Sequence, residues 1–275
     1  MPLGSGQIRG GRTMALSSRL RRLACALALV LAPPALAAQG CPGAVASRSL
    51  PIRLASLSAS EVRITFVGHA TFLVETPGGV RIATDYNDYV RPGVTPEVAT
   101  MNKAHSTHFS AAPDPAIAHV LRGWDPNGGA ARHDLQVGDA RIRNVPTNIR
   151  DYAGATEYDG NSIFVVEVAD LCIAHLGHLH HTLTPEHLRA LGRIDVVLVP
   201  VDGSYTLGQD GMIEVLAALN APVMIPMHFF GQATLQRFLA KAAERWPVEQ
   251  AGTASVTLTR DGLPSRPKVL VLQGR

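Results

Sequence analysis

The sequence predicts an α+β fold in which two β-sheets pack together with helices outside them. In the first half of the chain, apolar runs follow one another in pairs joined by short turns, as they do in antiparallel hairpins. The second half alternates apolar runs with helix-like segments, which is the order of β-α-β units. With 275 residues, 46% of them hydrophobic, the chain is long enough to fill the core of such a fold.

Three hairpins are expected before residue 180. Each pairs runs of apolar and β-branched residues around a turn that contains Gly or Asp. The paired segments are 62–67 and 72–75 with the return run 80–84, then 134–137 with 140–145, and 162–168 with 171–176.

The second half starts with a helix whose ends are marked in the sequence. Thr184 is a suitable N-cap before Pro185, and Gly192 follows the expected last turn. The later elements are a strand at 194–201, a helix at about 210–219, a strand at 223–227, a helix at 232–245 and a closing hairpin through Asp261-Gly262.

Residues 14–38 have the pattern of a secretory signal peptide. Arginines at 19–22 precede an unbroken apolar run at 23–31, which the two prolines at 33–34 interrupt. The small residues at 35–37 have the spacing of a cleavage site. Because a membrane-spanning helix needs about 20 apolar residues, we expect a periplasmic or secreted protein without a stable membrane anchor.

The expected domain boundaries follow from this leader. Residues 1–38 form the signal peptide, with Met14 as an alternative start, residues 39–60 a linker, and residues 61–275 one domain. Cleavage leaves Cys41 and Cys172, which can pair in an oxidising compartment. Cys172 lies in a strand-like run, however, and can equally be a small core residue.

The charge of the chain argues against a nucleic-acid partner. The formal net charge is +3, and no dense run of Lys and Arg interleaves with aromatic residues. We expect a small-molecule substrate, and nothing in the sequence indicates an oligomeric state.

Six of the 11 histidines lie within a few residues of the end of an expected strand. They are His69, His105, His108, His175, His178 and His228. If the strand ends meet at one edge, these imidazoles converge, as a catalytic divalent metal requires.

The ordinary alternative is that a histidine after a strand is a satisfied loop or core residue. We apply it to His119, His133 and His187, and expect His180 at the surface and His181 at an outer position of the site. His69 stands between the two interpretations.

The strand-end segments also resemble a known family. They read ITFVGHATF at 64–72, TD at 84–85, AHSTH at 104–108, AHLGHL at 174–179 and IPMH at 225–228. In this order and spacing the chain resembles the metallo-β-lactamase superfamily, specifically its ascorbate-6-phosphate lactonase-like branch. The resemblance covers residues from about 62 to 230 and implies a four-layer αββα sandwich.

The site departs from the family pattern at three positions: Lys103 stands for a histidine, and Thr107 and His178 each stand for an aspartate. The family's H-x-H-x-D-H motif aligns with Lys103, His105, Thr107 and His108, and its Gly-Asp with Gly177-His178. The resemblance then implies that one metal position keeps His105 and His175 while the other keeps His108 and His228. A neutral imidazole has one free lone pair and cannot bridge two cations as a carboxylate does. We therefore expect one metal per chain, with His178 and His69 as further candidate ligands.

The resemblance implies a metal-dependent hydrolase, with one Zn²⁺, or alternatively Mn²⁺ or Fe²⁺. A metal-bound hydroxide would attack an ester, lactone or phosphodiester bond. Asp85 would orient an imidazole, and His178 or an unligated neighbour would accept the proton. Lys103 either points inward and stabilises an oxyanion or points to solvent. The alternative function is a non-catalytic member that binds a metal or ligand in the same fold.

Overall fold

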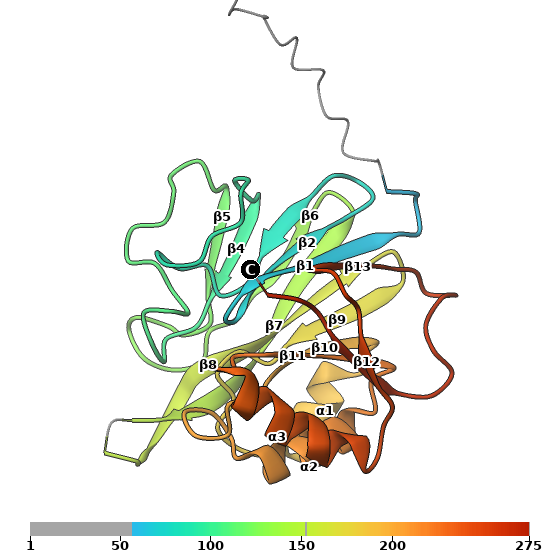
Figure 1. The fold of residues 1–275 in the computed structure, drawn as a ribbon. Helices are drawn as coiled ribbons and strands as arrows, with labels where there is room; N and C mark the ends of the chain where they lie inside the picture. Colours follow the sequence, from blue (N-terminus) through green and yellow to red (C-terminus); the bar gives the residue numbers. More distant parts are fainter. Residues whose placement is uncertain (1–56, 152, 275) are drawn as a thin grey trace, which may run out of the picture. The chain divides into compact units, whose positions relative to one another are not determined.

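The computed structural model describes residues 57–151 and 153–274, which form two packed β-sheets and three helices (Figure 1). The first sheet has six strands in the order β13-β1-β2-β3-β4-β5. Its strands are β1 (Val62–Gly68), β2 (Thr71–Glu75), β3 (Arg81–Ala83), β4 (Val98–Met101), β5 (His119–Arg122) and β13 (Ser255–Leu258).

The second sheet has eight strands in the order β12-β14-β11-β10-β9-β8-β7-β6. Its strands are β6 (Asp134–Val137), β7 (Ala140–Arg150), β8 (Thr156–Val168), β9 (Leu171–His175), β10 (Val196–Pro200), β11 (Val223–Met227), β12 (Val248–Gln250) and β14 (Lys268–Val271). The strands β6 to β9 pair antiparallel, whereas β9, β10, β11 and β14 run parallel. This division confirms the hairpins expected in the first half and the β-α-β units expected in the second.

The three helices are α1 (Pro185–Leu191), α2 (Gln209–Leu219) and α3 (Gln232–Ala243). The first begins where the sequence predicts, because the Thr184 hydroxyl accepts the backbone N–H of His187. Apolar side chains of all three helices pack against the eight-stranded sheet, among them Leu191, Met212 and Phe238. Figure 1 shows them together beneath that sheet.

The main core lies between the two sheets. Phe72 from β2, Phe164 from β8 and Ile225 from β11 are fully or almost fully buried there. On the outer face of the six-stranded sheet, loop residues such as Tyr86 and Ile117 provide the covering side chains. The predicted two-sheet sandwich is confirmed, and among the described residues its helices cover one outer face.

The expected closing hairpin through Asp261-Gly262 is wrong. The two segments on either side of that turn, β13 and β14, belong to different sheets. β13 pairs with β1, whereas β14 pairs with β11 and β12. A turn signal between two apolar runs predicts a reversal of the chain, but it does not show which sheet each run joins.

The expected leader lies outside the described residues, as does Cys41, so export and the disulfide stay predictions. Within the described part of the chain, no helix is both long and apolar enough to span a membrane.

Candidate metal centre

Three histidines from distant parts of the chain converge at one edge of the sandwich. His69 follows β1, His108 lies in the loop after β4, and His228 follows β11. One ring nitrogen of each lies within 4.8 Å of the corresponding atoms of the other two. His108 and His228 are fully buried, while His69 is half-buried. We call these three residues the histidine triad.

The backbone at this edge is held in an uncommon conformation. His69, Asp85 and His228 have positive φ angles of 52°, 41° and 54°, and each lies within two residues of a strand end. Non-glycine residues in this region cost on the order of 1 kcal/mol each and are found where the surrounding structure imposes them. Here the backbone N–H of His228 donates to the carbonyl of His69 at 2.7 Å, which brings two members of the triad together.

A buried carboxylate orients His108. Its Nδ1 lies 2.5 Å from Oδ2 of Asp85, and the side chain of Asn102 donates to the other carboxylate oxygen at 3.0 Å. Burial raises the pKa of Asp85 to about 6, against the lowering influence of the nearby His175 and the Asn102 hydrogen bond. At neutral pH the carboxylate is therefore ionised and accepts the Nδ1–H, so Nε2 of His108 carries the free lone pair.

A second carboxylate orients His228 in the same way. Oδ1 of Asp202 lies 3.0 Å from Nδ1 of His228, and the Thr206 hydroxyl and the backbone N–H of Ser204 donate to the same carboxylate. Burial opposes ionisation of Asp202, but the hydrogen bonds from His228 and Thr206 prevail and hold its pKa well below its usual range. Nε2 of His228 therefore also carries a lone pair.

The Nε2 lone pairs of His108 and His228 point toward each other. Nε2 of His108 and Nε2 of His228 are 3.0 Å apart, a distance at which two lone pairs repel unless a cation or proton lies between them. Nε2 of His69 is buried and has no hydrogen-bond partner among the described residues. Three imidazoles, two of them with a carboxylate behind the ring, are a donor set that suits a divalent metal such as zinc. The residues present therefore fit a divalent metal ion.

Two members of the triad, His69 and His108, are also kept neutral, as metal ligands must be. Burial, followed by the charges of His228 and His108, lowers the pKa of His69 to about 3. Burial and the neighbouring imidazoles also hold the pKa of His108 well below its ordinary value.

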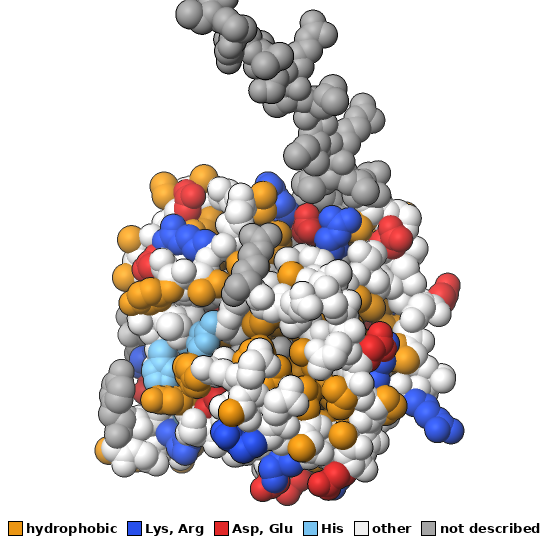
Figure 2. Space-filling view, viewed as in Figure 1, with side chains coloured by type: hydrophobic (Ala, Val, Ile, Leu, Met, Phe, Trp, Pro, Cys, Tyr) orange, Lys and Arg blue, Asp and Glu red, His pale blue; other side chains and the backbone are white. Residues whose placement is uncertain are grey.

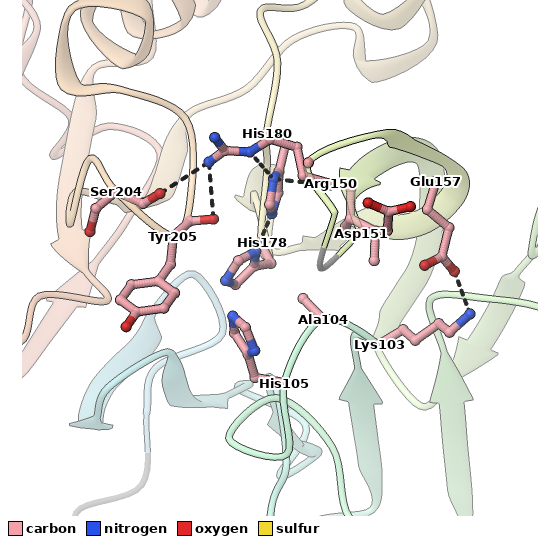
Figure 3. Close-up of a pocket in the computed structure, with 12 residues that line it drawn as sticks. Lys103, Ala104, His105, Arg150, Asp151, Glu157, His178, His180, Ser204 and Tyr205 are labelled. Atoms are coloured by element: carbon pink, nitrogen blue, oxygen red, sulfur yellow. Dashed lines mark hydrogen bonds and ion pairs between the residues drawn. The ribbon is translucent and has the colours of Figure 1, made fainter.

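Two further predicted residues border the triad. The ring of His178 lies 4.9 Å from that of His108 and 5.0 Å from that of His228, measured between centroids. His105 lies 4.7 Å from His178. Both line a cavity of about 430 Å³ that opens beside the triad, and Figure 3 shows their rings facing each other there.

The structure does not bring His175 into this group. Its Nε2 donates to the carbonyl of Ala70 at 2.8 Å, and its Nδ1 accepts the backbone N–H of Gly177 at 3.2 Å. With both ring nitrogens engaged, the side chain lies buried against Phe72. His175 connects two strand ends in the present geometry and offers no free lone pair.

Lys103 likewise lies away from the triad. Its ammonium group pairs with Glu157, and 47% of its side chain is exposed. The sequence left open whether Lys103 points into the site or to solvent, and in the structure it points outward. The ammonium lies at the rim of the cavity beside Asp151 and Glu157 (Figure 3), and it does not occupy a second metal position.

Several residues of the site were not predicted. Asp202 directly follows the run at 194–201, so the strand-end pattern that selected the histidines could have included it. His180 was expected at the surface, which is wrong: it is half-buried and its Nε2 lies 2.5 Å from Nδ1 of His178. Asn102 and Arg150 carried no sequence signal, because their roles depend on contacts across the fold.

A family model described as the beta-lactamase superfamily domain matches residues 63–228. Curated relatives include UPF0173 metal-dependent hydrolases. The protein from Pelotomaculum thermopropionicum is 24% identical over 229 residues, which cover 73% of this chain and 98% of that protein. The protein from Methanosphaerula palustris is 26% identical over 186 residues, which cover 61% of this chain and 84% of that protein. The sequence-based prediction of a metal-dependent hydrolase agrees with these names.

Solved structures give the same result. The crystal structure of a proposed Zn-dependent hydrolase of the metallo-β-lactamase superfamily from Thermotoga maritima is 30% identical, with a TM-score of 0.58, and the match covers 78% of this chain and 100% of that one. A proposed metal-dependent hydrolase from Parabacteroides distasonis has a TM-score of 0.55 at 14% identity, covers 78% of this chain and 94% of that one, and supports the fold alone. The chain belongs to the metallo-β-lactamase superfamily.

Proposed function

We propose that this protein is a metal-dependent hydrolase that works with a single divalent ion held by His69, His108 and His228. One observation carries the proposal. The carboxylates of Asp85 and Asp202 fix the two buried rings so that their Nε2 lone pairs face each other at 3.0 Å. Such an arrangement is costly without a cation and favourable with one.

A divalent ion in such a triad would supply Lewis acidity, polarising a substrate oxygen and lowering the pKa of water. The protein's part is to orient the ligands and to provide acid–base groups. His105 is half-buried at the edge of the cavity, and burial lowers its pKa, so that it is neutral near pH 7. A neutral imidazole at this place can accept the proton that the attacking water loses.

The shape of the site favours a small substrate with an apolar part. The cavity of about 430 Å³ lies within the range usual for small-molecule sites. Tyr205 lines the cavity and is 56% exposed. The ring of Phe230, which is 62% exposed, lies 5.3 Å from that of Tyr205. Figure 2 shows histidine side chains reaching the surface next to apolar ones. An ester, lactone or phosphodiester with an apolar group fits these surroundings, and the lactonase-like branch stays a prediction.

Metal content and hydrolysis measured on one sample test the proposal. Full-length protein purified without chelator should contain zinc, manganese or iron, and it should hydrolyse p-nitrophenyl acetate or bis(p-nitrophenyl) phosphate. Treatment with a chelator should remove both the metal and the activity, and added metal should restore them. Metal without turnover on any ester, lactone or phosphodiester would favour the non-catalytic alternative, and absence of metal would reject the triad as a ligand set.

We also propose that the protein acts outside the cytoplasm, on the basis of the leader pattern at 14–38. N-terminal sequencing of the protein from its native host should find a mature chain that begins near Ala38. A membrane-bound product that retains residues 19–31 would contradict this.

A further inference from the structure

One buried polar atom beside the triad is not part of the proposed metal site. Nε2 of His178 is buried and has no hydrogen-bond partner among the described residues. We propose that this atom is a permanently protonated N–H that donates to the anionic oxygen formed on the substrate, and that Arg150 and His180 fix it in this state. The inference rests on the proposed hydrolytic function, which it deepens by assigning an oxyanion donor.

Arg150 determines the tautomer of His180. Its backbone N–H and its side-chain Nε–H both point at Nδ1 of His180, at 3.1 Å and 2.9 Å. A guanidinium group has donors and no acceptor, and a backbone N–H only donates. Nδ1 of His180 must therefore be the unprotonated nitrogen, and the proton of this ring is on Nε2.

The tautomer of His180 in turn determines that of His178. Nε2 of His180 lies 2.5 Å from Nδ1 of His178, and Figure 3 shows the chain of contacts from Arg150 through His180 to His178. Because His180 donates, Nδ1 of His178 must accept, so it carries no proton. A neutral imidazole has one N–H, and in His178 that N–H is on Nε2. A protonated ring is excluded by the same contact, since two N–H groups would then face each other.

Neighbouring residues hold Arg150 and the backbone of His178 in place. The guanidinium of Arg150 donates to the carbonyls of Ser204 and Thr206, at 3.1 Å and 3.0 Å. The backbone N–H of His178 donates to Oδ1 of Asn161 at 2.7 Å. Gly177, just before it, has a φ of +60°, and a Cβ there would lie 2.4 Å from the same amide oxygen. The backbone that carries His178 is therefore fixed from two sides.

The tautomer makes His178 a hydrogen-bond donor instead of a metal ligand. An N–H has no lone pair for a metal, so in this tautomer His178 is not a ligand, and its ring still faces His108 and His228 about 5 Å away. Preorganised donors aimed at a position where negative charge develops are a main source of rate enhancement in acyl and phosphoryl transfer. His178 is therefore a catalytic residue, and His180 and Arg150 are positioning residues.

The tautomer can be measured without activity or metal. Long-range ¹H–¹⁵N NMR of the full chain, labelled at histidine and stripped with a chelator, should show His178 with a protonated Nε2 and an imine-type Nδ1. His180→Leu should abolish this preference, because it removes the donor to Nδ1. His180→Gln should keep it, because the amide can accept from Arg150 and donate to His178. His181→Leu is the matched control and should leave it unchanged. A proton on Nδ1 of His178 in the unmodified protein would overturn the inference.

Kinetics on zinc-loaded protein separate this inference from the proposed function. His178→Phe should lower kcat for p-nitrophenyl acetate by roughly 10²–10³-fold while zinc content and the thermal unfolding midpoint stay at the level of the unmodified protein. His180→Leu should lower kcat with little change in KM, and His180→Gln should recover most of the loss. If His178→Phe instead loses the zinc, His178 is a ligand and the inference is wrong, although the hydrolase assignment stands.

Discussion

Two groups of histidines in this molecule have similar distances between their rings, but their ring nitrogens have different hydrogen-bond partners. In the histidine triad, two rings are anchored through Nδ1 by buried carboxylates, and their Nε2 atoms face each other. The second group is His181 and His187, whose ring centroids lie 5.5 Å apart near α1. There, His181 accepts the backbone N–H of Asn148 and contacts the carbonyl of Thr182, and His187 accepts the backbone N–H of Thr184.

Both groups bring imidazoles close together, so the difference between them lies in where the ring nitrogens point. Backbone groups engage the ring nitrogens of His181, and the hydrogen-bonded nitrogen of His187 closes the N-terminus of a helix. Carboxylates behind the triad instead turn the remaining lone pairs toward one point, where a cation can bind. A cluster of histidines thus indicates a metal site when its nitrogens are left free by an outer layer of acceptors.

The largest effect that tests this comparison is loss of a triad ring. His108→Ala and His228→Ala should each lower metal affinity by more than about 100-fold, the upper range for changes behind a ligand. Calorimetric titration of stripped protein with Zn²⁺ measures this, and bound zinc should no longer raise the thermal unfolding midpoint. His187→Ala is the control, and equal loss of affinity in all three variants would remove the distinction between the two groups.

Removal of the charge behind a ring should have a smaller effect. Asp85→Asn and Asp202→Asn keep the side-chain shape but replace an acceptor-only group with one that can also donate. We expect metal affinity to fall by roughly 10–100-fold in each case, measured by competition with a chromophoric chelator. Unchanged affinity in both variants would show that the carboxylates do not set the ring orientation.

The stripped protein should lose stability as the pH falls. His69 has a folded pKa of about 3 against an ordinary 6.5, and His108 and His178 are lowered in the same direction, first by burial. Their stabilising contribution is present above pH 6.5 and is lost as the pH falls toward the folded value, by at most about 1.4 kcal/mol per pH unit for each ring.

Asp85 acts in the opposite direction, because its pKa is raised from 3.8 to about 6. Its contribution is present below about pH 4 and is lost as the pH rises through 6, but it is one group against three. The free energy of unfolding in urea should therefore decrease from pH 7 to pH 5. His69→Gln should make the decrease shallower, and a stability that stays constant over this range would contradict the buried, neutral state of the rings.

The smallest effect is expected in the second group. His187→Ala removes one half of the capping box that His187 forms with Thr184. Chemical denaturation should show a loss of about 1 kcal/mol or less, with zinc affinity and turnover unchanged. A fall in zinc affinity would show that this group communicates with the triad.

The sequence predicted the sandwich and most strand and helix positions, because hairpin turns, strand periodicity and the Thr184 cap act locally. It also predicted that histidines at strand ends would gather, and the structure places His69, His105, His108, His178 and His228 together. Which of these histidines face the metal site and which form other hydrogen bonds could not be predicted. His175 ends β9 and His178 follows three residues later, yet the ring of His175 donates to the carbonyl of Ala70 and the ring of His178 faces the triad.

Partners from distant segments decide these orientations. Asp85 reaches His108 across 23 positions of sequence, and Asp202 reaches His228 across 26. Lys103, in the loop after β4, was aligned with a metal position by register alone, whereas an ion pair with Glu157 on β8 sets the direction of its side chain. One-dimensional spacing contains no information about such pairs, although the strand-end pattern applied to carboxylates would have selected Asp202.

The central claim is that one metal ion is held by three imidazoles, and metal stoichiometry combined with X-ray absorption tests it most directly. Stripped protein titrated with Zn²⁺ should saturate at one equivalent per chain, and its absorption fine structure should fit three imidazole nitrogens, with one fewer in His69→Ala. Binding of two tightly held equivalents, or a ligand set that persists in His69→Ala and is lost in His175→Ala, would contradict the account.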